Sequence, residues 1–202
     1  MTEGRAAVRA FFTERAAHWD ARFPHDGPAY AAAVAALDLP RGASVLDAGC
    51  GTGRALPTLR QAVGQEGTVL GADLTPAMLD EAVRKGRGRD AALVIADVSQ
   101  LPLGDDRLDA VFGAGLISHL PGAESGLREL ARVVRPEGQL ALFHPVGRAA
   151  LAARQGRQIT PDDVRAEPVL RPLLAAAGWR LVSYVDEDDR YLALAVRESR
   201  GS

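Results

Sequence analysis

Apolar residues near the N-terminus recur at the three- and four-residue spacing of an amphipathic helix, with charged residues between them. The apolar positions of this first segment are Val8, Phe12, Ala16, Trp19 and Phe23. The pattern predicts one N-terminal helix, which either covers the core or closes over a ligand site as a lid. A second helix is predicted by the positions of Tyr30, Val34 and Leu37.

From residue 44 onward, short apolar runs alternate with amphipathic segments. The runs predict strands over residues 44–49, 67–73, 92–97, 108–115 and 139–144. The segments predict helices over 52–63, over 75–86 and around Leu127, Leu130, Ala131 and Val134. In the second of these, Thr75 suits the N-cap, Pro76 the first helical position and Gly86 the C-cap. Such alternation implies a parallel sheet with helices on both faces.

The C-terminal part of the chain shows a different pattern. Thr160 and Pro161 indicate the start of a further helix, which Pro168 and Pro172 then interrupt. Two alternating apolar runs follow, over residues 179–185 and 190–196, and the acidic turn DEDD joins them. This arrangement predicts an antiparallel hairpin at the end of a mostly parallel α/β sheet.

Length, charge and cysteine content narrow the class of protein. A chain of 202 residues favours a single domain, and a formal net charge of −2 gives no general attraction to nucleic acid or to an anionic membrane. Cys50 is the only cysteine, so the sequence predicts no intrachain disulfide and no metal site. The charged N-terminus lacks the apolar core of a signal peptide, and no apolar run approaches a membrane span. We therefore expect a cytoplasmic protein without a membrane partner.

Three glycines, Gly49, Gly51 and Gly53, follow the first predicted strand. Glycines at this turn allow positive φ and let the backbone approach a ligand closely. The dinucleotide motif GxGxxG would require its third glycine at Arg54, and a P-loop would require Lys–Ser/Thr where Arg54–Ala55 stand. Both phosphate-binding interpretations are therefore disfavoured.

Three carboxylates end the first three predicted strands, at Asp47, Asp73 and Asp97. Asp47 would repel a pyrophosphate but would favour a cationic group. Asp73 could accept hydrogen bonds from both hydroxyls of a ribose, and Asp97 could accept one from an adenine amino group. A ligand that combines an ammonium, a sulfonium and a nucleoside fits this set.

Four segments, in this order and spacing, resemble the class I S-adenosylmethionine (SAM)-dependent methyltransferases. They are VLDAGCGTG, GADLTPAMLDEA, ADVSQLPLGDDRLDAVF and LRELARVVRPEGQLAL. The resemblance is to the small-molecule group (methyltransferase type 11) that includes the ubiquinone and menaquinone biosynthesis enzymes, and it is best over residues 28–146. It implies a Rossmann-like three-layer sandwich whose seven-stranded, mostly parallel sheet ends in an antiparallel hairpin strand. It also implies one methyltransferase domain over 1–202, with an N-terminal helix or lid in 1–27, a SAM-binding core in 28–146, and a substrate-side segment and hairpin in 147–202.

The resemblance further implies which residues bind SAM or its product, S-adenosylhomocysteine (SAH). The glycines would pack against the methionine and ribose portion, and Asp47 would lie near the methionine amino end. Asp73 would hold the ribose, Asp97 the adenine amino group, and backbone after the fourth strand the ammonium. The full expected set is Asp47, Gly49, Gly51, Gly53, Asp73, Leu74, Met78, Asp97, Val98, Gly113 and Ala114.

Methyl transfer from a sulfonium requires a base only where the acceptor must lose a proton. His119 and His144 follow the fourth and fifth predicted strands and are the candidates for that base. The expected partner is a small-molecule acceptor, and the protein would be a monomer or a homodimer. Three alternatives stay open: a protein or RNA acceptor, a SAM-binding protein without transferase activity, and an NAD-dependent oxidoreductase, against which Asp47 and Arg54 argue.

Overall fold

Seven strands form one sheet in a computed structural model that describes residues 3–199. The strands are β1 (Ser44–Ala48), β2 (Thr68–Asp73), β3 (Ala92–Ile95), β4 (Leu108–Ala114), β5 (Val134–His144), β6 (Trp179–Glu187) and β7 (Arg190–Arg197). Their order is β3-β2-β1-β4-β5-β7-β6. The pairs among β1 to β5 are parallel, whereas β7 lies between β5 and β6 and is antiparallel to both. The predicted α/β architecture with an antiparallel C-terminal hairpin is confirmed.

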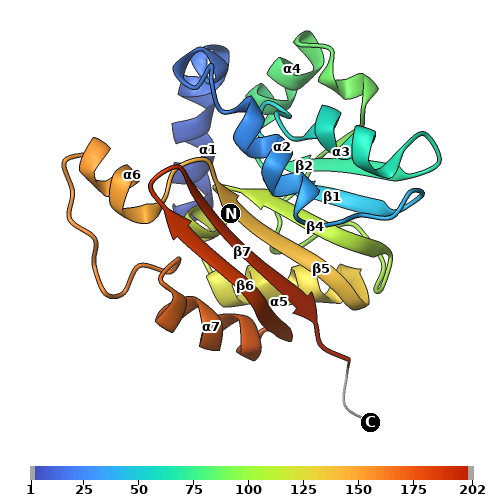
Figure 1. Cartoon of the computed structure of the whole chain (residues 1–202). Helices are drawn as coiled ribbons and strands as arrows, with labels where there is room; N and C mark the ends of the chain where they lie inside the picture. Colours follow the sequence, from blue (N-terminus) through green and yellow to red (C-terminus); the bar gives the residue numbers. More distant parts are fainter. Residues whose placement is uncertain (1–2, 200–202) are drawn as a thin grey trace.

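Helices cover both faces of the sheet (Figure 1). They are α1 (Glu3–Arg15), α2 (Gly27–Ala35), α3 (Leu56–Val63), α4 (Pro76–Arg84), α5 (Ala123–Val133), α6 (Arg148–Arg154) and α7 (Glu167–Ala176). One buried cluster joins α2 and α3 to one face, and a second joins α5 and α7 to the other. Since β1 to β5 run in parallel, their carboxyl ends meet at one edge, where ligands bind in sheets of this kind.

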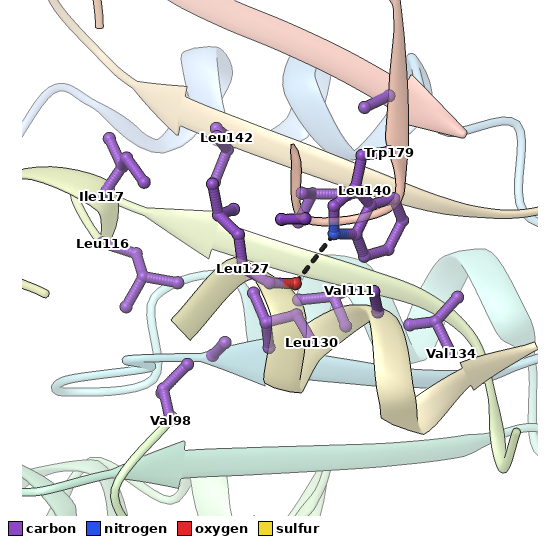
Figure 2. Packing of buried hydrophobic residues seen from close by; sticks show 14 of the residues in the cluster. Val98, Val111, Leu116, Ile117, Leu127, Leu130, Val134, Leu140, Leu142 and Trp179 are labelled. Atoms are coloured by element: carbon purple, nitrogen blue, oxygen red, sulfur yellow. Dashed lines mark hydrogen bonds between the residues drawn. The ribbon is translucent and has the colours of Figure 1, made fainter. Parts of the chain in front are cut away.

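The core beneath α5 fixes the loop that follows β4 (Figure 2). Leu140 and Leu142 of β5 pack with Leu127 of α5, and the fully buried Trp179 closes the cluster. The Trp179 indole Nε1 donates a hydrogen bond of 2.9 Å to the Leu127 carbonyl oxygen. Leu116 and Ile117, just after β4, belong to the same cluster, so the core holds the first turn beyond the strand in place.

The N-terminal segment is not the single helix that its spacing predicts. The helix α1 ends at Arg15, and two short 3-10 turns follow at Ala16–His18 and Asp20–Arg22. The Asp20 carboxylate accepts a hydrogen bond of 2.6 Å from Thr52 Oγ1 and pairs with Arg87 at 2.8 Å. These contacts with Thr52 of the glycine loop and with Arg87 after α4 bend the N-terminal segment. Helical spacing in the sequence could not show such a bend.

Two predicted helix boundaries near the sheet are wrong. Residues 52–55 form the turn of the glycine loop, and α3 begins only at Leu56, with Pro57 in its first turn. Val134 does not belong to a helix, because β5 starts there. The register between β5 and β4 shifts between Leu108 and Ala110 of β4. The residues RPEG form that irregularity, and Glu137 has a φ of 65°.

The C-terminal helix boundaries also differ from the prediction. No helix begins at Thr160–Pro161, because residues 157–166 form loop and turns, and α6 lies before them. Pro168 occupies the first turn of α7, where proline is tolerated, and so helps to start the helix that it was expected to interrupt. The predicted start and stop signals of α4 are confirmed. The helix begins at Pro76 after Thr75, and Gly86 follows its end with a φ of 77°.

Candidate cofactor and acceptor site

The glycine loop after β1 turns back on the ends of β1 and β2. Gly49, Gly51 and Gly53 have φ values of 66°, 54° and 77°, so the loop requires the left-handed conformation that glycine adopts freely. A Cβ on Gly53 would lie 2.8 Å from Leu56 Cδ1, so this glycine also serves the packing of the loop on α3. Gly49 and Gly51, by contrast, face the cavity described below.

Asp73 at the end of β2 holds the glycine loop by hydrogen bonds. Its Oδ2 accepts from the Gly51 N–H and its Oδ1 from the Thr75 N–H, both at 2.8 Å. Burial raises the pKa of Asp73, and these two hydrogen bonds oppose that rise. Each carboxylate oxygen keeps a second lone pair, so Asp73 can still accept bonds from a ligand.

Asp47 near the end of β1 is a buried carboxyl group in the wall of the cavity. Only 1% of its surface is exposed, and Oδ1 has no hydrogen-bond partner among the described residues. Burial first, and then repulsion by Asp73, raise the pKa of Asp47 well above its ordinary value. A cationic ligand group beside Asp47 would compensate both effects.

Asp97, just after β3, is engaged by the N-terminal helix. The Nε of Arg5 lies 2.6 Å from Asp97 Oδ2, and Arg5 Nη2 donates a hydrogen bond of 2.8 Å to Ser99 Oγ. Oδ1 accepts from the Ser99 N–H and hydroxyl at 2.8 and 2.6 Å. Helix α1 is therefore tied to the end of the sheet at the position that the sequence assigned to an adenine.

These carboxylates and glycines surround one cavity of about 890 Å³ at the carboxyl ends of the strands. A volume of this size lies within the range of small-molecule sites, about 300–1,000 Å³. The predicted site residues that line it are Asp47, Gly49, Gly51, Asp73, Leu74, Met78, Asp97, Val98, Gly113, Ala114, His119 and His144. Gly53 lies outside this lining.

Aromatic side chains of the N-terminal segment line the cavity beside His119. The rings of Phe12 and Trp19 lie 5.4 Å apart, and those of Trp19 and Phe23 lie 5.3 Å apart. The His119 ring meets Phe12 at 5.0 Å and Phe11 at 6.5 Å. Desolvation, and then the charge of Arg165, lower the pKa of His119, which lines the cavity and keeps part of its surface exposed.

His144 at the end of β5 has a defined orientation. Its Nδ1 lies 2.7 Å from the Val146 carbonyl oxygen and 3.1 Å from the Val146 N–H. We assign the proton to Nδ1 on the shorter contact, which leaves the lone pair on Nε2. Burial chiefly lowers the pKa of His144, the Val146 hydrogen bond opposes this, and Arg165 adds to it. A neutral imidazole of this kind can accept a proton near neutral pH.

Several cavity residues have no signal in the sequence. Arg5, Arg165 and Tyr191 all line the cavity, but they come from segments with no motif. Tyr191 could have been found only from the hairpin register, which pairs it with His144. Arg54, which argued against a phosphate site, donates to the Phe23 carbonyl oxygen at 2.6 Å and pairs with Asp26 at 3.3 Å, so it anchors the N-terminal segment.

Residues 45–138 match a family model described as a methyltransferase domain. A demethylmenaquinone methyltransferase of Corynebacterium urealyticum is 33% identical over 163 residues, which are 80% of this chain and 63% of that protein. The chain carries a class I methyltransferase domain. The earlier resemblance is thereby confirmed, and the family and fold imply SAM as the cofactor. The chain spans about a third to two thirds of the length of curated relatives that it matches, with shares of 32%, 42% and 63%.

Solved structures agree with the architecture of the methyltransferase domain. A SAM-dependent methyltransferase from Aquifex aeolicus has a TM-score of 0.68 and 26% identity, covering 81% of this chain and 87% of that one. A methyltransferase in complex with the Trm112 activator of Haloferax volcanii has a TM-score of 0.77 and 19% identity, covering 96% and 99%. The second likeness concerns the fold alone.

The residues of the methyltransferase domain fit SAM. The buried, unpartnered Asp47 Oδ1 suits a ligand with a positive charge, and the glycine loop brings backbone to the cavity wall without intervening side chains. Among residues 3–199 there is no cluster of three or more His, Cys, Asp or Glu that could hold a metal ion. No helix in that part of the chain is long and apolar enough to cross a membrane.

Removal of residues 1–24 tests the role of the N-terminal segment. Neither core cluster of the methyltransferase domain contains a residue before Ala29, so we expect the truncated protein to fold. Its affinity for SAH should fall about tenfold or more, because Arg5, Phe12 and the Asp20–Thr52 hydrogen bond are lost. Calorimetry would measure the affinity, and Asp20→Ala would isolate the contact with the glycine loop. Unchanged affinity together with normal turnover would refute the lid interpretation.

Proposed function

We propose that this protein transfers the methyl group of SAM to a small-molecule acceptor. The observation that carries the proposal is that three strand-end carboxylates, the glycine loop and two histidines line the same cavity. The demethylmenaquinone methyltransferase relatives act, by name, on a small molecule, which supports the same acceptor class. In this proposal residues 28–146 bind the cofactor, and residues 1–27 and 147–202 shape the acceptor side of one domain.

The cofactor would be held mainly by the ends of β1 to β4. Asp47 would face the cationic methionine end, Asp73 the ribose, and Asp97 with Val98 the adenine, while Leu74 and Met78 line the cavity beside them. SAM supplies a methyl group already activated by its attachment to a sulfonium. The protein then has to align the acceptor and exclude water, an effect worth up to about 7–11 kcal/mol in favourable cases. The aromatic residues of the N-terminal segment would exclude water.

His144 would accept the proton of an acceptor that must ionise. Its replacement by asparagine should lower kcat about a hundredfold, the low end of general-base effects. Because the pKa of His144 lies below its ordinary value, the rate should stay constant through neutral pH and fall only below about pH 6.5. His119→Asn is the matched variant, with a smaller expected loss. A rate that His144→Asn leaves unchanged would remove the histidine from the mechanism.

Two binding titrations and one transfer assay test the proposed function. The purified protein should bind SAH with micromolar affinity and should not bind NAD. Tritium from methyl-labelled SAM should then pass to one member of a panel of small hydroxylated arenes and quinols. Label found instead in added protein or RNA would favour the macromolecular alternative, and SAH binding without any transfer would favour a binding protein. The proposed monomer or homodimer can be checked by light scattering on the same sample.

A further inference from the structure

The part of the cavity lining that comes from residues 144–191 differs in charge from the rest of the lining. Its lining between residues 144 and 191 contains Arg154, Arg157 and Arg165 but no carboxylate. The carboxylates Asp47, Asp73 and Asp97 all lie at the ends of β1 to β3. The lining between residues 144 and 191 is therefore positively charged, whereas the rest of the lining carries both signs, with Arg5, Arg15, Arg22, Asp26 and Arg54 beside the strand-end carboxylates.

Tyr191 presents an unsatisfied hydroxyl group at this end. The residue is 1% exposed and lines the cavity, and its Oη has no hydrogen-bond partner among the described residues. It stands opposite His144 in the antiparallel register of β5 and β7. Burial raises its pKa far above the ordinary value, so the hydroxyl stays protonated and can donate a hydrogen bond.

Arg165 lines the same cavity as His144, and its charge acts to lower the pKa of that histidine. Its side chain is 11% exposed, and its contacts with Asp163 use Nη2, at 3.2 Å, and Nε, at 3.3 Å. Tyr184 Oη donates a hydrogen bond of 2.8 Å to the Arg165 carbonyl oxygen, which holds the backbone of the loop. Nη1 takes no part in the contacts with Asp163, and a guanidinium held on one side by a carboxylate can donate to a second oxygen.

We propose that Arg165 and Tyr191 form an oxyanion subsite and that the methyl acceptor is an aromatic or enolic hydroxyl compound. This inference rests on the proposed methyltransferase function. His144 Nε2 would take the proton of the acceptor hydroxyl, and the resulting oxyanion would lie between the Tyr191 hydroxyl and the Arg165 guanidinium. The acceptor gains the methyl group, while the electron pair of the broken carbon–sulfur bond stays on sulfur. The rings of Phe11, Phe12 and Trp19 provide the apolar wall that such an acceptor needs.

The probe 4-nitrophenol tests the subsite, because its absorbance separates the bound phenolate from the neutral form. With SAH present, the wild type should bind the phenolate about tenfold more tightly than 4-nitroanisole, which has no acidic proton. Tyr191→Phe and Arg165→Gln should each reduce phenolate affinity about tenfold and leave the affinities for SAH and 4-nitroanisole unchanged. Arg154→Gln is the matched control, since this exposed arginine lines the same part of the cavity and should have little effect.

The outcomes separate this inference from the proposed function. Equal binding of phenolate and anisole, equal losses in all three variants, or no phenolate binding to the SAH complex would overturn the subsite. If the wild type does not bind SAH, that result contradicts the proposed function instead. Selective binding of the phenolate by the same sample would still support the subsite. If Arg165→Gln fails to fold because Asp163 keeps only its longer ion pair with Arg148, at 3.8 Å, Tyr191→Phe decides the question alone.

Discussion

Asp73→Ala is expected to lower the affinity for SAH about a hundredfold or more, because two hydrogen bonds to a charged group are lost at about 1.5–3 kcal/mol each. The carboxylate would hold both ribose hydroxyls and also fixes the Gly51 and Thr75 N–H groups at 2.8 Å. Its removal therefore takes away ligand contacts and loosens the loop that shapes the cavity. Calorimetry with SAH measures the loss.

The Asp73→Asn variant should bind SAH no more tightly than the Asp73→Ala variant. Both carboxylate oxygens accept from backbone N–H groups, so the amide NH₂ would face a second donor at one of them. Asp109→Ala is the matched control: Asp109 Oδ2 accepts from the Ser44 N–H at 2.7 Å, at the opposite end of the sheet. If Asp109→Ala and Asp73→Ala weaken SAH binding equally, the effect is general destabilisation, and the assignment of Asp73 to the ribose fails.

The fold could be predicted from the sequence where one local rule decided the outcome. Buried strands read as continuous apolar runs, and glycine and proline mark the ends of α4, so these elements were found. Predictions failed where tertiary contacts override local spacing. Residues after Arg15 keep a helical pattern, yet the chain bends there because Asp20 binds Thr52 and Arg87 from other elements.

The residues of the candidate site also fall into those that could be predicted from the sequence and those that could not. Most of the residues assigned to the cofactor lie at the carboxyl ends of strands or in the turns that follow, where sequence position determines spatial position. All of the assigned residues except Gly53 line the cavity. The proposed acceptor side is built from residues that only folding brings together. Arg165 comes from a loop without regular structure, and Tyr191 faces His144 because of a hairpin register that no motif specifies. Arg5 reaches Asp97 across more than ninety residues of sequence.

Asp47→Asn is expected to stabilise the ligand-free protein while weakening its affinity for SAM. The buried carboxyl of Asp47 has one oxygen without a hydrogen-bond partner among residues 3–199, and burial together with Asp73 raises its pKa. The native state therefore binds the Asp47 proton more tightly than the unfolded state. That contribution to stability is fully present below the unfolded pKa of about 3.9 and is lost as pH rises through the folded pKa. Asparagine removes this loss, with a gain at neutral pH of about 1–3 kcal/mol.

Thermal unfolding at pH 5 and pH 8 would measure the effect of Asp47→Asn on stability. The gain over wild type should be larger at pH 8, whereas Asp80→Asn, on the exposed side of α4, should change neither value. The affinity for SAM should fall about tenfold, since a charge-assisted contact becomes a neutral one. A variant that is less stable than wild type at both pH values would show that Asp47 is a structural carboxylate. A variant that is more stable but binds SAM poorly would mean that Asp47 is retained for its charge, at the expense of the fold.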